Sequence, residues 1–153
     1  MPTITQNVLL PALGEAMETL AFMVPDTDPD PEMPPPANGL RATMCFTGPV
    51  NGFIEIWADE NFARQLVSNI LPEDAADAPA ADQIVDAFKE LLNTTCGLVL
   101  PRLATTSADV FDVTIPQATA FPDGAAWNDF VAQPEVLLLC VDGHPLAARL
   151  AVG

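Results

Sequence analysis

Two long stretches of the chain carry apolar residues at helical spacing. In residues 7–24 the apolar positions recur every three or four residues, as at Leu9, Leu13 and Met17, so an amphipathic helix is predicted there. The second stretch runs from about residue 80 to residue 100. Pro101 is expected to end this helix, because a proline disfavours helical geometry in the residue before it.

A shorter helix is predicted in "DENFARQLVSNIL", where Phe62, Leu66 and Ile70 face inward and Asp59 is a suitable N-cap. It follows two segments, "LRATMCFTG" and "VNGFIEIWAD", which alternate about "GPVNG". Alternation with a period of two residues and a glycine-containing connection predict a β-hairpin.

The last third of the chain has the composition of strands. "DVFDVTIP" is followed by a predicted loop through "FPDGAAWNDF" and then by "EVLLLCVDGHPLAARLAV". In that last segment Asp142-Gly143 lies between two apolar runs and is typical of a tight hairpin turn. His144, the only histidine, lies in the turn with no acid or thiol partner within reach in the sequence, so we expect it to be a surface residue.

These elements predict one α/β (α+β) domain over residues 1–153, with two long helices packed on a mostly antiparallel sheet in the approximate order αββααβββ. A weak internal repeat favours approximate two-fold symmetry. "LGEAMETLAFMVP" and "FKELLNTTCGLVLP" both end a helix at proline, and aligning Glu15 with Glu90 sets Glu18 opposite Asn93. Residues 25–39 are rich in proline and aspartate, a composition that cannot pack a core, so an extended surface loop is predicted there.

The charge balance restricts the partners. The formal net charge is −16, with one Lys and four Arg, which argues against nucleic acid and against anionic membranes. No signal peptide and no membrane-spanning segment are expected from the sequence. Cys45, Cys96 and Cys140 are an odd number without CxxC spacing, which indicates three reduced core thiols in a cytoplasmic protein.

One face of the second long helix carries polar residues in a narrow line. At about 100° per residue, Asp86, Glu90, Asn93 and Gly97 fall on the side opposite to the apolar residues. Gly97 costs the helix roughly 1 kcal/mol relative to alanine and removes a side chain, which would let another surface approach closely. Spacing alone is more typical of an ordinary solvated face than of a site.

The segment "ELLNTTCG" resembles the E-x-x-N-x-x-x-G signature of the CheC/CheX/FliY phosphatases of bacterial chemotaxis, and CheX-like domains in particular. The resemblance extends to "FTGPVNGFIEIWADENFARQLVSNIL", "VTIPQATAF" and "LLLCVDGHPLAARL", and covers about residues 17–152. It implies a phosphatase of phosphorylated receiver domains in two-component signalling, with CheY as the best-known substrate, and a homodimer.

The resemblance also implies roles for residues. Asn93 would orient a water molecule in line with the phosphorus, because a carboxamide donates and accepts hydrogen bonds without titrating. Glu90 would form an ion pair with the receiver's active-site lysine, and Asp86 and Gly97 would contact the partner. No metal or cofactor of its own is expected, since the receiver already holds Mg²⁺.

Some features depart from the family pattern and leave alternatives open. "LVLP" follows Gly97 where small or polar residues are common, and the first helix carries Glu15 and Glu18 without an Asn, so no second site is expected there. A non-catalytic receiver-binding module of the same fold is the alternative to a phosphatase. A structural subunit similar to the FliY relatives is a third reading.

Overall fold

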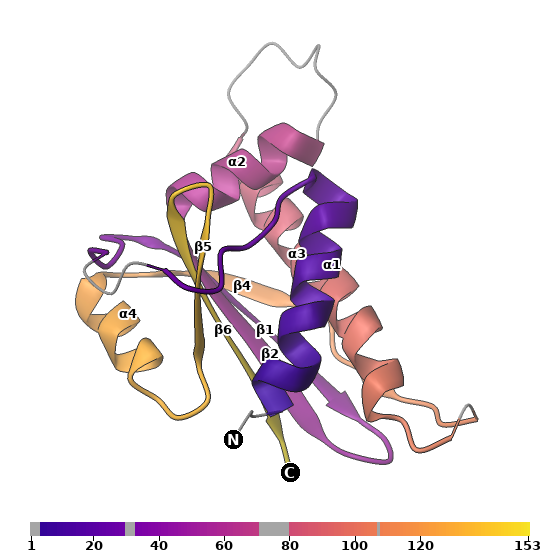
Figure 1. The fold of residues 1–153 in the computed structure, drawn as a ribbon. Helices are drawn as coiled ribbons and strands as arrows, with labels where there is room; N and C mark the ends of the chain where they lie inside the picture. Colours follow the sequence, from indigo (N-terminus) through magenta and orange to yellow (C-terminus); the bar gives the residue numbers. More distant parts are fainter. Residues whose placement is uncertain (1–3, 30–32, 71–79, 107) are drawn as a thin grey trace.

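A six-stranded antiparallel sheet forms the centre of the computed structural model, which describes residues 4–29, 33–70, 80–106 and 108–153 (Figure 1). The strand order is β3-β1-β2-β6-β5, and β4 pairs with β1 on the same side as β3. The strands are β1 (Gly39–Thr47), β2 (Gly52–Asp59), β3 (Asp112–Val113), β4 (Gln117–Phe121), β5 (Leu137–Val141) and β6 (His144–Val152).

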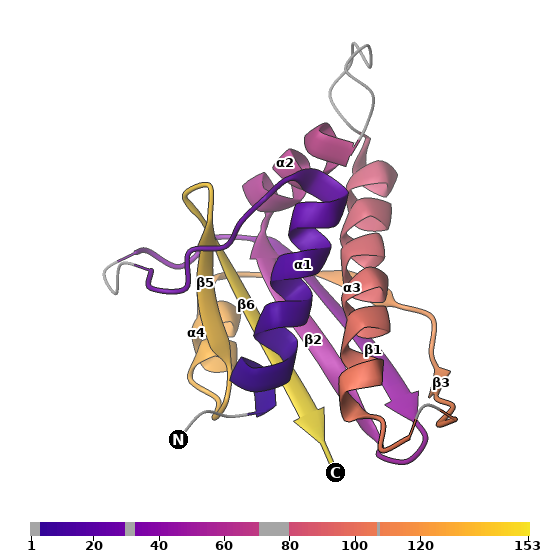
Figure 2. The same ribbon diagram turned by 45° about the vertical axis from the view of Figure 1, so that its right-hand side comes forward.

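Three helices cover one face of this sheet. A π-helical turn, η1 (Thr5–Leu9), leads into α1 (Leu10–Ala21), which lies beside the long helix α3 (Ala81–Leu103), with α2 (Glu60–Ile70) across one end (Figures 1 and 2). The short helix α4 (Gly124–Val131) packs on the opposite face. The predicted α+β class, with two long helices on an antiparallel sheet, is therefore confirmed.

Each face of the sheet has its own core, because side chains alternate along a strand. On β2, Ile54, Ile56 and Ala58 point toward α1 and α3, whereas Trp57 points the other way. The larger core contains Leu13, Met17, Phe62, Phe88, Leu91 and Val99 from the helices. The smaller core, under α4, contains Trp57, Phe121, Trp127, Phe130 and Ala147. In it the ring of Trp57 stacks on Phe130, with ring centroids 4.7 Å apart.

Two hairpins meet at the middle of the sheet. The β1–β2 hairpin and the β5–β6 hairpin contact each other through their second strands, with Ile56 opposite Ala148 in the antiparallel register of β2 and β6. This is the strand arrangement that an approximate two-fold axis between β2 and β6 would produce. The turn of the second hairpin is as predicted, since Asp142 and Gly143 have φ values of 51° and 84°.

Local hydrogen bonds explain where the helices begin. The Phe62 backbone N–H donates to Asp59 Oδ1 over 2.7 Å, so the predicted N-cap of α2 is confirmed. At the start of α3 the Ala80 backbone N–H donates to the side chain of Gln83 over 2.9 Å.

Two predicted helix ends are wrong. The first helix ends at Ala21, because Phe22 adopts a left-handed conformation with φ 57°, and Val24 lies beyond it, 70% exposed. The second long helix continues past Pro101 to Leu103, and the Ala104 N–H donates to the Leu100 carbonyl. Pro101 has no N–H to donate to the carbonyl four residues earlier, and the helix continues for only two residues beyond it.

The segment "FPDGAAWNDF" was predicted to be a loop and contains α4. Asp123 Oδ1 accepts a hydrogen bond from the Ala126 N–H over 2.9 Å, which caps the helix. Trp127 and Phe130, three residues apart, are both buried against the sheet. The residues Pro-Asp-Gly at the start of this helix are typical of a turn. The contact of the two rings with the sheet stabilises the helix that follows them.

Several predicted environments also differ. Cys45 is exposed and Cys140 is half-buried, so only Cys96 is a core thiol, although all three cysteines are free. Ile70 is 37% exposed at the end of α2 and does not face inward. In the proline-rich segment Asp26 pairs with the edge of β5 through two backbone hydrogen bonds to Cys140, so that part is not a simple surface loop. Residues 30–32 of this segment lie outside the described residues.

Candidate functional site on the outer face of α3

The two sides of α3 differ in their exposure to solvent. The side toward the sheet and α1 is buried and contains Ile84, Phe88, Leu91, Leu92, Thr95, Cys96 and Val99. The Thr95 hydroxyl donates to the Leu91 carbonyl over 2.7 Å, so this polar residue is satisfied within the core. Asp86, Glu90, Asn93 and Gly97 are all exposed on the other side. We call these four residues the polar line of α3.

Glu90 and Asn93 lie one helical turn apart on the polar line. The Thr94 hydroxyl donates to Glu90 Oε1 over 3.2 Å, which restrains the carboxylate beside the helix. Among the residues that the structure describes, none forms a hydrogen bond with the Asn93 carboxamide. Thr94 was not among the predicted site residues, although its position four residues after Glu90 is a spacing that brings helical side chains together.

Gly97 leaves open space on the polar line. A Cβ atom added at this position would have no atom within 4 Å, apart from the neighbouring backbone of its own helix. Packing within the described part of the chain therefore does not require glycine here. A partner approaching the helix one turn beyond Asn93 would meet no side chain at this position.

At the other end of the polar line, Asp86 lies beside α2. It lines a hollow of about 250 Å³ together with Val67, Ile70, Gln83 and Ala87. Lys89, the only lysine of the chain, is half-exposed next to Glu90 and has no ion pair among the described residues. The site therefore carries two carboxylates, one ammonium group and one carboxamide along about two to three turns of helix.

The equivalent face of α1 has different chemistry. Glu15 and Glu18 are exposed, and no asparagine lies beside them on α1. Glu15 faces Arg102 of α3 at 3.8 Å, a long contact between side chains that are both well exposed, so it contributes little to stability. The Glu-Asn pair is thus present on α3 and not on α1.

Other titratable groups are poor candidates for catalysis. Burial raises the pKa of the Cys96 thiol to about 11, so the thiolate needed for nucleophilic attack is scarce at neutral pH. His144 Nδ1 lies 3.7 Å from Asp59 Oδ2, an acid partner that is distant in the sequence and was not expected. Asp59 is itself occupied as the cap of α2, and burial raises its pKa.

The described ranges contain no group of three or more His, Cys, Asp or Glu side chains that could hold a metal ion. No helix within them is long and apolar enough to cross a membrane.

The fold defines the class of protein. CheX from Desulfovibrio desulfuricans aligns with a TM-score of 0.68 and 14% identity over 96% of this chain and 97% of that one. CheX from Vibrio vulnificus gives 0.68 and 15%, over 96% and 95%. CheX of Borrelia burgdorferi, solved in a complex with CheY, BeF₃ and Mg²⁺, gives 0.63 and 19%, over 95% and 96%. At these identities the likeness shows a shared fold.

A family model identifies the chain more closely. Residues 40–126, which include all of β2, α2 and α3 and all of β1 but its first residue, match the model of the chemotaxis phosphatase CheX. The chain belongs to the CheX family. No curated protein sequence matches it significantly.

Proposed function

We propose that the protein hydrolyses the aspartyl phosphate of a CheY-like receiver domain in a chemotaxis or other two-component pathway. The observation that carries the proposal is the polar line of α3, where Glu90 and Asn93 are exposed one turn apart. Two further observations support a receiver domain as the partner: the chain belongs to the CheX family, and a CheX relative was solved in a complex with CheY.

The proposed chemistry asks little covalent work of this chain. Water attacks the phosphorus in line with the bond to the aspartate, that P–O bond breaks, and inorganic phosphate and a free carboxylate result. Asn93 holds the attacking water by hydrogen bonds, and Glu90 pairs with the receiver's active-site lysine to fix the position of α3. The receiver supplies Mg²⁺, which neutralises the charge on the phosphoryl oxygens.

The decay of a phosphorylated receiver tests this proposal. Asn93→Ala should lower the rate at saturating receiver by about a hundredfold, because the water loses its positioning group. Asn128→Ala, at an exposed asparagine on α4, is the matched control and should behave as the wild type. Phosphate release from an excess of phosphorylated receiver gives both kcat and KM.

The outcomes separate the phosphatase from its alternative. Wild-type chain that binds phosphorylated receivers without accelerating their decay would be a receiver-binding module. If the Asn93→Ala chain is as active as the wild type, the assigned role of the carboxamide is wrong.

We also propose that the chain forms a homodimer through the β3 edge of the sheet and acts in the cytoplasm. Val110 and Ile115 flank β3 and are 77% and 81% exposed, and Val113 within it is 49% exposed. The opposite edge, at β5, is partly covered by Asp26. Apolar side chains along an uncovered strand edge suit pairing with a second chain.

A further inference from the structure

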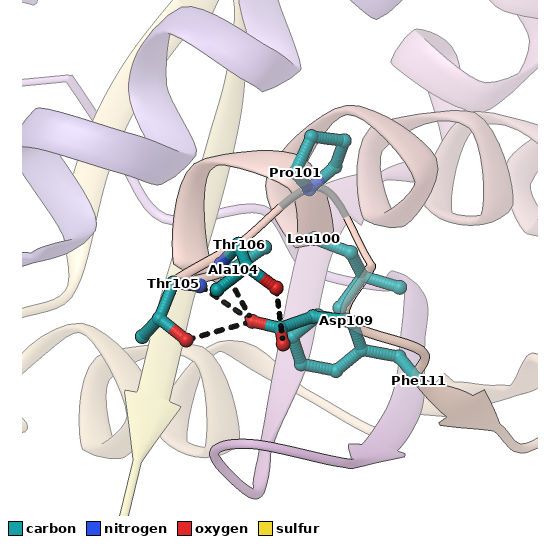
Figure 3. A pocket seen from close by; sticks show the side chains of 7 residues that line it. All are labelled: Leu100, Pro101, Ala104, Thr105, Thr106, Asp109 and Phe111. Carbon is teal, nitrogen blue, oxygen red and sulfur yellow. Dashed lines mark hydrogen bonds between the residues drawn. The ribbon is translucent and has the colours of Figure 1, made fainter.

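A hollow of about 590 Å³ lies where α3 ends (Figure 3). Leu100, Pro101 and Ala104 line it from the last turn of the helix, and Thr105, Thr106, Asp109 and Phe111 line it from the segment that follows. Its walls are therefore apolar on the side of Leu100, Pro101 and Phe111, and polar around Asp109.

The Asp109 carboxylate is held firmly in this hollow. Oδ2 accepts hydrogen bonds from the backbone N–H groups of Thr105 and Thr106, at 2.6 and 3.0 Å, and from the Thr105 hydroxyl at 2.9 Å. Oδ1 accepts from the Thr106 hydroxyl at 3.0 Å. Figure 3 shows the carboxylate turned toward both threonines. These bonds, those from the backbone first, lower the pKa of Asp109 to about 2, so the group is an anion at physiological pH.

This anion has no positive partner within the described part of the chain. The ion pairs there join Arg64 to Glu60, Arg102 to Glu15 and His144 to Asp59. All four donors to Asp109 are neutral groups, so the carboxylate keeps its full charge beside the apolar wall.

The hollow continues the polar line of α3. Ala104 follows Asp86 by 18 residues, which is five helical turns, so it returns to the same side of the helix. Leu100 and Pro101 lie on either side of that direction. At 1.5 Å per residue Ala104 is about 16 Å along the helix from Asn93, which is within reach of a docked domain about 30 Å across.

We propose that this hollow receives a lysine or arginine side chain of the receiver domain docked on the polar line. The aliphatic part of that side chain packs on Leu100, Pro101 and Phe111, and its charged end binds Asp109. The inference rests on the proposed function and names a second contact for the same partner.

Charge and shape both favour a basic side chain. Because the chain has a net charge of −16, it attracts the positively charged side chains of a partner. Lysine and arginine combine an apolar stem with a charged end, as the walls and the carboxylate of the hollow require. The volume exceeds that of one side chain, so the backbone segment carrying it can enter as well.

The test measures binding of a CheY receiver held in its active state by Mg²⁺ and BeF₃⁻, which stands in for the phosphoryl group. Asp109→Asn should weaken binding about fivefold, as expected for the loss of one partly exposed ion pair. Asp129→Asn is the matched control, because Asp129 is an exposed carboxylate on α4 that lies neither in the hollow nor on the β3 edge. It removes the same net charge and should change the affinity by less than about twofold.

A second variant leaves Asp109 in place. Ala104→Leu narrows the hollow from the C-cap of α3, where the backbone is extended and accepts any L-residue, and it should also weaken binding. In turnover assays both variants should raise KM and leave kcat unchanged, because neither residue reaches the phosphoryl group. Thermal unfolding of each variant checks that the fold is intact.

The possible failures are distinguishable. If the wild-type chain binds no phosphorylated receiver, both the proposed function and the proposed role of the hollow are wrong. If the wild type binds the receiver and its phosphatase activity depends on Asn93, but Asp109→Asn and Asp129→Asn bind alike, only the assignment of the hollow is overturned. A change in kcat for Asp109→Asn would also contradict it.

Discussion

Gly97 is an unfavourable residue for its position in the interior of α3. Glycine in a helix interior is less favourable than alanine by about 1 kcal/mol. Nothing in the described structure fills the space that a methyl group would take there. The cost is therefore not offset by packing within the chain, and a contact with another molecule would explain it.

Replacing Gly97 by alanine should separate stability from docking. We expect Gly97→Ala to raise the free energy of unfolding by up to about 1 kcal/mol, through helix propensity alone. The added methyl group should at the same time weaken receiver binding about tenfold, because it holds the two surfaces apart. Urea unfolding and the affinity for the receiver with BeF₃⁻ measure the two effects.

Gly14 of α1 provides the control for this substitution. A Cβ atom there would make an ordinary contact at 3.9 Å with Pro25, so Gly14→Ala should also stabilise the protein. It lies on another helix and should leave receiver binding unchanged. If the Gly97→Ala variant binds the receiver as well as the wild type does, the proposal that the receiver approaches α3 closely at Gly97 is wrong.

The elements differ in how far the sequence alone predicts them. Helical spacing correctly predicts that the four residues of the polar line are exposed, because exposure there depends only on helical geometry and on the apolar residues opposite, whereas their roles stay predictions. The sequence did not reveal α4, whose apolar residues are few and whose stability comes from the contact of Trp127 and Phe130 with the sheet. The pair of His144 and Asp59 was missed for the same reason, since it joins residues far apart in the chain.

The cap of α4 can be tested directly. Asp123→Ala should lower the free energy of unfolding by about 1 kcal/mol, because the Ala126 N–H loses its acceptor. Asp129→Ala is the control: Asp129 lies near the C-terminus of the same helix, where a negative charge is unfavourable, so its removal should be neutral or slightly stabilising. Equal effects of the two substitutions in denaturant unfolding would argue against the capped helix.

At the scale of the whole molecule, the polar line and the proposed dimer edge lie on different elements, α3 and β3. The hollow lies between them, because Asp109 and Phe111, which line it, are the neighbours of Val110 in the chain. Both surfaces must work against the net charge of −16, because two copies of the chain repel each other over roughly 8 Å at physiological ionic strength. An apolar strand edge is suited to self-association, since burial of its side chains does not depend on charge.

The proposed dimer leads to a prediction about Ile115. In a two-fold interface each substitution acts twice, and losing the burial of two isoleucines costs about 3 kcal/mol or more. Ile115→Lys should therefore weaken dimerisation by at least about a hundredfold, which sedimentation over a range of concentrations would detect. Because Ile115 is 81% exposed, the monomer should remain folded.

Val24→Lys is the matched control, since Val24 is 70% exposed but lies after α1, on the segment leading to the β5 edge. It adds the same charge and should leave the dimer intact. If the two variants dissociate alike, the added lysine acts through charge and not through β3. A wild-type chain that stays monomeric at high concentration would show that the β3 edge does not pair with a second copy, and its exposed valines and isoleucine would then need another occupant.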